Sequence, residues 1–218
     1  MMQTTRYLKS IKAPKLGILK PGSNNKKLGS KITKGPWKGK RIFSLTLTER
    51  ATCPTSCHHW EDCYGNNMPF AHRFDHSDYD ALIHHLENDI DTLTTKYMEG
   101  VAIRLHVLGD FFSEQYITFW DIMLLVYPTL TVYGYSAHHP DTEMGKKITQ
   151  LNLRYSDRCA IRFSVSGDYD PLTKNRFAAE ESYDGKSFDC PEQTGKVKSC
   201  AACALCWDAT KTVRFLSH

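Results

Sequence analysis

The sequence lacks any long apolar run, and its first residues carry charges with no apolar stretch behind them. A membrane-spanning helix needs roughly 20 consecutive apolar residues, so we expect no membrane association. A secretory signal needs a shorter apolar core, so we expect none of that kind either. With 218 residues, 41% of them hydrophobic and 24% charged, the composition is typical of a folded globular chain. These features predict a cytoplasmic protein.

Acidic residues are missing from the first 41 positions. Residues 1–41 hold 12 Lys or Arg and no Asp or Glu, whereas residues 42–218 hold 16 basic and 24 acidic residues. The formal charges are therefore +12 and −8. Such a basic arm can contact the phosphates of a nucleic acid, or it can pack against the acidic remainder of the chain. Packing within the chain is slightly favoured, because no basic motif with aromatic residues accompanies the arm.

Beyond residue 40, strand and helix patterns alternate. Apolar residues alternate with polar ones or form short runs at 42–48, 101–107, 130–135 and 160–165, which predicts four strands. Helical spacing of apolar residues predicts helices at 77–100, 113–127 and 141–155. This order predicts an α/β fold with parallel strands, either a partial (βα) barrel or a small open sheet of about four strands. We divide the chain into a basic arm (1–40), an α/β core (41–170) and a cysteine-rich metal-binding tail (171–218).

Parallel strands place their carboxyl ends at one edge of the sheet, where ligands usually bind. Arg104 and Arg162 lie inside the predicted strands, and we expect them to line a polar cavity or to join a buried ionic network. His106 alternates onto the same side as Arg104. Our candidate catalytic residues for a small-molecule substrate are Arg104, His106, Asp110 and Arg162. Our candidate cofactor contacts, all near strand ends, are Gly109, Ser136 and Ser166.

Three of the eight cysteines follow the first predicted strand in the pattern C-x3-C-x5-C. We call Cys53, Cys57 and Cys63 the first cysteine set. Closely spaced thiolates on a loop are typical ligands of a 4Fe–4S cluster, and three of them leave one iron open to a substrate. Zinc completed by His58 or His59 is the alternative.

Four further cysteines lie in the tail, and we call Cys190, Cys200, Cys203 and Cys206 the second cysteine set. The run C-x2-C-x2-C resembles the ligand runs of ferredoxins, and four thiolates make a complete set for a 4Fe–4S cluster or for zinc. Seven thiols divided as three and four favour two metal sites, although one shared site stays open. The eighth cysteine, Cys159, is expected to be a small buried apolar residue.

The first cysteine set, placed after the first strand and followed by βα units, resembles the radical S-adenosylmethionine (AdoMet) enzymes. The resemblance implies a partial (βα) barrel, a 4Fe–4S cluster on these three thiols, AdoMet bound at the open iron, and reductive radical chemistry.

Four segments also resemble the gene product 88-like proteins of phages: LTERATCP (47–54), CYG (63–65), RLHVLGDFFS (104–113) and CPEQTGK (190–196). This resemblance implies a viral source, and hence a location in the host cytoplasm. Two hypotheses follow from the sequence. The chain is an iron–sulfur enzyme acting on a small molecule, or it is a nucleic-acid-binding module stapled by structural zinc or an inert cluster.

Overall fold

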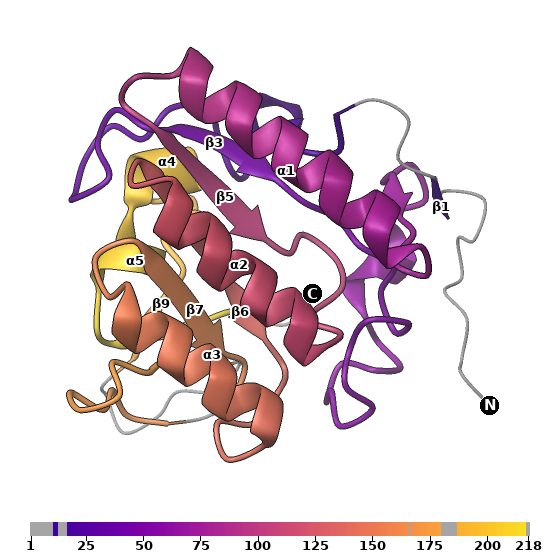
Figure 1. Cartoon of the computed structure of the whole chain (residues 1–218). Coiled ribbons are helices and arrows are strands. Elements are labelled where there is room, and N and C mark those ends of the chain that lie inside the picture. The colour runs from indigo at the N-terminus through magenta and orange to yellow at the C-terminus, as the bar shows by residue number, and fades with distance from the viewer. Residues whose placement is uncertain (1–10, 13–16, 166, 180–186, 217–218) are drawn as a thin grey trace.

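The computed structural model describes residues 11–12, 17–165, 167–179 and 187–216. Helices α1 (Tyr79–Lys96), α2 (Glu114–Val126) and α3 (Glu143–Arg154) lie side by side over one face of a sheet (Figure 1). The short helices α4 (Cys200–Cys203) and α5 (Leu205–Asp208) lie on the other side of the sheet from them. The chain is therefore built as a central sheet between a helical layer and a second, less regular layer.

The sheet is open and has eight strands in the order β2-β3-β5-β6-β7-β8-β10-β9. All neighbouring strands are parallel except β2 and β3, which are antiparallel. Their bounds are β2 Lys20–Pro21, β3 Arg41–Ser44, β5 Val101–Leu105, β6 Leu130–Ser136, β7 Cys159–Phe163, β8 Arg176–Ala179, β9 Ser187–Asp189 and β10 Thr212–Arg214. A separate parallel pair joins β1 (Ile11–Lys12) to β4 (Arg73–Phe74).

The four strands predicted from the sequence correspond to β3, β5, β6 and β7. The sheet is larger than the predicted four strands because β2 of the basic arm joins one edge and the tail strands β8, β9 and β10 extend the other. The tail strands have three or four residues each, and all of β9 and most of β8 are only half-buried. Segments so short show no clear alternation, so periodicity could not reveal them.

The helical layer covers a continuous apolar core. Alternate residues of β5, such as Ile103 and Leu105, pack with Leu86 of α1 and Trp120 of α2 in one buried cluster. Each helix begins at a polar cap: the side chains of Asp78, Ser113 and Thr142 accept backbone N–H bonds from the first turns of α1, α2 and α3. No helix among the described residues is long and apolar enough to cross a membrane.

The opposite face of the sheet is covered by two segments that are far apart in the sequence. Residues from 28–37 and from 200–207 share a second buried cluster with Ala102 and Tyr133 of the sheet. The rings of Trp37 and Trp207 stack with centroids 5.2 Å apart and an interplanar angle of 4°. The backbone N–H of Cys200 donates to the carbonyl of Lys27 at 2.7 Å. The described part of the basic arm therefore packs directly against the segment that carries the second cysteine set.

Candidate functional site

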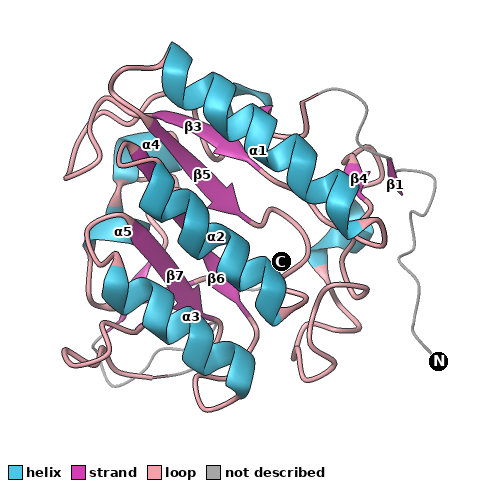
Figure 2. Cartoon of the chain, viewed as in Figure 1, coloured by secondary structure: helices cyan, strands magenta, loops and turns pink. Residues whose placement is uncertain are grey.

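The loops after three parallel strands meet around Asp110. The parallel strands β3, β5 and β6 point toward the same edge of the sheet, as Figure 2 shows. One carboxylate oxygen of Asp110 accepts the backbone N–H of Ala137, just after β6, and the other accepts that of Phe111, both at 2.7 Å. The backbone N–H of Asp110 donates to the hydroxyl of Thr52 at 3.1 Å, next to the first cysteine set. Asp110 thus joins the loops that follow β3, β5 and β6.

Two candidate cofactor contacts hold this junction together. Gly109 has a φ of +85°, and a Cβ there would lie 2.6 Å from the hydroxyl oxygen of Thr52. The turn therefore requires glycine. Ser136 is buried, its hydroxyl accepts the backbone N–H of His138 at 3.2 Å, and it also hydrogen-bonds Asp110. The third candidate, Ser166, lies outside the described residues.

The first cysteine set sits half-buried on the loop between β3 and β4. Burial, and to a smaller extent the charge of Asp110, raises the pKa of Cys53 to about 12. Burial also raises the pKa values of Cys57 and Cys63, while backbone amides of residues 59 and 65 hydrogen-bond the two thiols and act in the opposite direction. Cys53 is electrostatically coupled to both other thiols, so the three are neighbours in space.

A buried arginine fastens this loop to the sheet. Arg73 of β4 is completely buried, and its guanidinium donates hydrogen bonds to both carboxylate oxygens of Glu49, at 2.5 and 2.9 Å. Its remaining N–H donors bind backbone carbonyls at 3.0–3.1 Å, those of Gly65, Met68 and Ala71. The loop is therefore held by an ion pair whose charges cancel.

The second cysteine set is compact. Cys190 follows β9, Cys200 and Cys203 are the two ends of α4, and Cys206 lies in α5. The single residue between these helices, Ala204, adopts a left-handed conformation with φ of 67°. Its small side chain permits the tight reversal, and its Cβ packs in the second buried cluster.

Several donors point at the second set. Backbone amides of residues 192 and 193 hydrogen-bond the thiol of Cys190, and that of residue 205 bonds the thiol of Cys203. The hydroxyl of Tyr135 donates to the sulfur of Cys206 at 2.9 Å. Burial nevertheless raises the pKa values of Cys190, Cys200 and Cys203. Without a metal these thiols are protonated at neutral pH, whereas as ligands they would meet donors already in place.

A second buried arginine fastens this segment, in a different way. Arg162 of β7 is completely buried, and burial lowers its pKa, against the influence of the nearby Cys206. Its five N–H groups donate at 2.6–3.1 Å to backbone carbonyls, those of Phe177, Leu205, Cys206, Ala209 and Lys211. Among the described residues it has no carboxylate partner. Its positive charge therefore lies beside Cys206 of the second set and is met only by carbonyl dipoles in the described part of the chain.

A cavity of about 520 Å³, which we call the central cavity, lies between the two cysteine-bearing segments. Its floor is the second face of the sheet, with Arg104, Tyr133 and Tyr135. Three thiols of the second set lie on one wall, those of Cys190, Cys200 and Cys206. The opposite wall comes from the first loop, through His58, His59 and Tyr64. The two cysteine-bearing segments thus border one cavity, and the thiols in its described lining all belong to the second set.

All eight cysteines lie in the described part of the chain, and none forms a disulfide. As the described side chains stand, no three or more His, Cys, Asp or Glu groups converge tightly enough to hold a metal ion. Four thiolates around a single zinc lie only about 3.8 Å apart, as the Zn–S distance dictates. A four-iron cluster sits between its thiolates and keeps them farther apart. The described thiols match neither arrangement as they stand, so the choice between a zinc ion and a cluster stays a prediction.

His106 does not share the face of Arg104, because β5 ends at Leu105 and the alternation ends with it. The imidazole is buried in the helical layer, where Nε2 lies 3.0 Å from the hydroxyl of Tyr116 and Nδ1 has no hydrogen-bond partner among the described residues. Burial, aided by the charge of Arg104, lowers the pKa of His106 to about 3. His106 is therefore a neutral core residue away from the central cavity.

Sequence reasoning singled out neither Arg73 nor Tyr135. Tyr135 pairs with Arg162 across β6 and β7, and Tyr133 pairs with Arg104 across β5 and β6. Aligning the predicted strands in register would have placed these tyrosines beside the two arginines. Arg73 lies in a strand of two residues, for which the sequence carries no signal.

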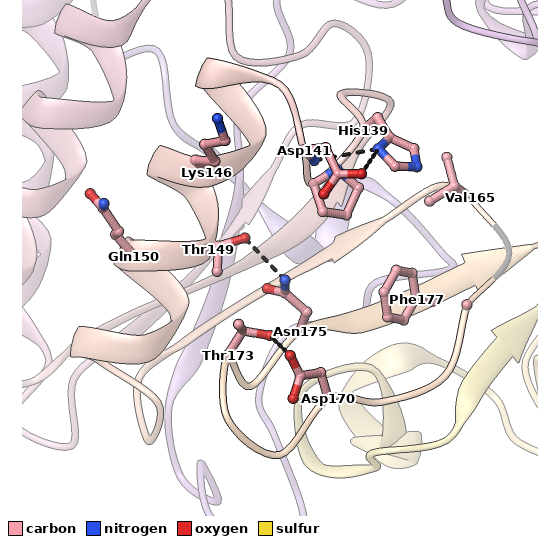
Figure 3. A pocket seen from close by; sticks show the side chains of 12 residues that line it. His139, Asp141, Lys146, Thr149, Gln150, Val165, Asp170, Thr173, Asn175 and Phe177 are labelled. Carbon is pink, nitrogen blue, oxygen red and sulfur yellow. Dashed lines mark hydrogen bonds and ion pairs between the residues drawn. The ribbon is translucent and has the colours of Figure 1, made fainter.

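A second hollow of about 590 Å³ lies between α3 and the segments that flank β8. Figure 3 shows its polar side chains, where Asn175 donates to the hydroxyl of Thr149 at 3.0 Å and Thr173 donates to Asp170 at 2.7 Å. Its described lining includes no cysteine and none of the candidate site residues that the structure describes. The central cavity is therefore the stronger candidate site.

No family model, curated protein or solved structure matches this chain. The resemblances to the radical AdoMet enzymes and to the gene product 88-like proteins stay predictions.

Proposed function

We propose that this chain is an iron–sulfur protein whose second cysteine set holds a 4Fe–4S cluster beside the central cavity, and that it acts on a small molecule bound there. The first cysteine set holds a second cluster with one open coordination position at the strand edge. Zinc in either set is the alternative metal, and AdoMet is a candidate ligand of the open iron.

The observation that carries the proposal is the charge of Arg162, which lies beside Cys206 of the second set and has no carboxylate partner among the described residues. Leaving a cation unpaired in a protein interior is costly. A 4Fe–4S cluster ligated by four thiolates is an anion overall, so it would neutralise Arg162. Lys27, Lys34 and Arg104 act on the same thiols and also lower their pKa values. The surroundings of the second set thus favour an anionic group.

Donors already aimed at the sulfurs give further support. Hydrogen bonds from amides and from Tyr135 stabilise thiolates and tune the reduction potential of the cluster that they ligate. When bound, such a cluster supplies one-electron transfer or Lewis-acid chemistry at an open iron. The chain itself contributes the cavity, the excluded water and the fixed charges around it.

The first set differs in its neighbours, which include the carboxylates of Asp110 and Asp62. Asp110 holds three loops at the strand edge, so it positions the first set with respect to the sheet. Burial raises the pKa of Asp110. A protonated Asp110 would tolerate an anionic cluster beside it and could deliver a proton there.

The test is metal and sulfide analysis of protein purified without oxygen, with visible absorption and EPR spectra. Two clusters predict about eight irons and eight sulfides per chain, and one cluster predicts about four of each. Zinc without sulfide would contradict the proposal.

The exposed lysines of the described arm favour a second candidate function, nucleic-acid binding. Lys26, Lys34 and Lys38 are exposed on the outside of the second layer. Contacts to phosphates would give an affinity that falls steeply with salt, and replacing these three lysines by Ala would weaken it. A fluorescence titration with short DNA and RNA duplexes at low salt measures this, and the absence of any binding there would remove the candidate.

A further inference from the structure

We propose that the central cavity binds a small organic anion with a flat body, and that Arg104 recognises its acidic group. This inference rests on the proposed function, because it assigns a substrate class to the same cavity.

Arg104 is a strand residue whose guanidinium reaches into the cavity floor. One nitrogen donates to the carbonyl of Leu105 at 2.8 Å. A guanidinium has five N–H donors, so most of them remain for a ligand. Among the described residues Arg104 has no carboxylate within ion-pair distance. Arg104 differs from Arg162 in its number of available donors, because all five N–H groups of Arg162 already bind backbone carbonyls.

The charges around the cavity favour an anion. Among the described residues of its lining, Arg104 and Lys27 are permanent cations and Asp62 is the only acidic residue. Asp62 is largely exposed and lies 3.4 Å from His59. Lys27 lies 3.6 Å from Glu192, which leaves Arg104 as the principal uncompensated charge. A cleft of one sign of charge with apolar walls concentrates ligands of the opposite sign.

The aromatic walls favour a flat ligand. The guanidinium of Arg104 lies over the ring of Tyr135, with 4.5 Å to the centroid, and 5.9 Å from that of Tyr133. Stacking fixes the plane of the guanidinium, so its N–H edge is presented in one orientation. Tyr64 and Phe215 add further ring surface to the lining. The volume of about 520 Å³ lies in the range of small-molecule sites, and a cluster on the thiol wall would leave room only for a small ligand.

The N–H fork of an arginine matches a carboxylate and a phosphate equally well. The test is therefore a calorimetric titration of the full chain, as purified, with three probes: benzoate, phenyl phosphate and the neutral benzyl alcohol. We expect either benzoate or phenyl phosphate to bind at least tenfold more tightly than benzyl alcohol. The one that binds more tightly shows whether the cavity prefers a carboxylate or a phosphate.

Substitutions of Arg104 test whether this residue recognises the acidic group of the ligand. Arg104→Met should weaken the anion at least tenfold, and Arg104→Lys, which keeps the charge but loses the fork, should fall between. Arg154→Met is the matched control, because Arg154 is an exposed arginine paired with Asp121 in the helical layer, and it should leave affinity unchanged. Equal affinity for benzyl alcohol, or unchanged binding in both Arg104 variants, would overturn the inference. Circular dichroism of each variant checks that it is folded. If Arg104→Met does not fold, the binding measurement on Arg104→Lys still tests the role of Arg104.

Iron and sulfide analysis of the same samples separates the two proposals. Selective anion binding that depends on Arg104 in protein without iron would refute the iron–sulfur function and support this inference. Loaded clusters with no preference for the anions would overturn this inference alone.

Discussion

The two cysteine-bearing segments are fastened to the same sheet by two completely buried arginines that differ in how their charge is met. Arg73 binds the carboxylate of Glu49 under the first set, so that anchor is neutral overall. Arg162 binds only backbone carbonyls under the second set, so that anchor keeps its charge. A neutral anchor stabilises a loop whatever the loop binds. A charged anchor is stabilised in turn by an anion above it, which is why the second set is the stronger candidate for a resident cluster.

The neighbours of the thiols follow the same division. In the first set, the carboxylates of Asp110 and Asp62 act on Cys53 and Cys57, although Arg50 and Arg73 act on Cys63. In the second set, the cations Lys27 and Arg104 act on Cys200. The first set is half-exposed, whereas three thiols of the second set are buried. We infer that the second set holds its group permanently and that the first set is the more accessible and exchangeable site.

Loss of ligands gives the largest expected effect. Cys200→Ser should remove the iron of the second set and lower the melting temperature markedly, because Cys200 is part of the second buried cluster. Cys57→Ser should remove only the iron of the first set with little change in melting temperature, since its loop is half-exposed. Iron analysis and thermal melts measure both effects. Cys159→Ala is the control: Cys159 is buried beside Asn152, away from both sets, and its loss should leave the iron content intact. Equal iron loss in all three variants would contradict the assignment of separate groups to the two cysteine sets.

Replacing the two anchors sharpens the comparison. Arg162→Met leaves five carbonyls without this donor, and Arg73→Met removes the buried ion-pair partner of Glu49, so each should cost about 3–5 kcal/mol in the free energy of unfolding. Urea denaturation measures these costs. A second change, Glu49→Gln, should recover part of the stability lost in Arg73→Met, because it removes a buried charge that has lost this partner. Arg154→Met, at an exposed pair, should change stability by less than about 1 kcal/mol. A loss of stability in Arg162→Met as small as that in Arg154→Met would contradict the role of Arg162 as a buried anchor.

The pH dependence of stability tests whether His106 is buried in the core as a neutral imidazole. His106 has a pKa of about 3 when folded, against roughly 6.5 when unfolded. Between these values the unfolded chain binds a proton that the folded chain does not, so acidification destabilises the fold by up to about 1.4 kcal/mol per pH unit. His106→Gln should remove this dependence between pH 6 and pH 4 in urea titrations. His84→Gln, at an exposed position on α1, serves as the control and should retain it. Parallel pH profiles for wild type and His106→Gln would contradict the burial of a neutral imidazole.

The smallest expected effect concerns the donor to Cys206. Tyr135→Phe removes one hydrogen bond to a ligand sulfur, worth about 1 kcal/mol, and should lower the one-electron reduction potential by about 40 mV. The sign follows because a hydrogen bond stabilises the more negative, reduced cluster more than the oxidised one. EPR-monitored redox titration measures it. Tyr127→Phe, on the far helical layer beside Asp91, is the matched control, and a shift there of the same size would remove the assignment.

The strands that are long enough to show alternation were predictable from the sequence, as were the helices between them and the crossover order. The placement of Asp110 at a shared strand edge also follows from parallel topology alone. The tail strands were not predictable, because they are too short for periodicity to show. Nor was the role of Arg162, since five backbone carbonyls from two distant segments leave no mark on a sequence. His106 was misplaced because alternation was extended one residue beyond the end of β5.

The most direct test of the central claim is iron and sulfide analysis, with EPR spectra of the reduced state, on a variant in which Cys53, Cys57 and Cys63 are all replaced by Ser. Only the second set then remains to bind a group. Purified without oxygen, this variant should retain about four irons and four sulfides per chain and give the EPR signal of a reduced 4Fe–4S cluster. Zinc without sulfide, or no bound metal, would contradict the assignment of a cluster to the second cysteine set.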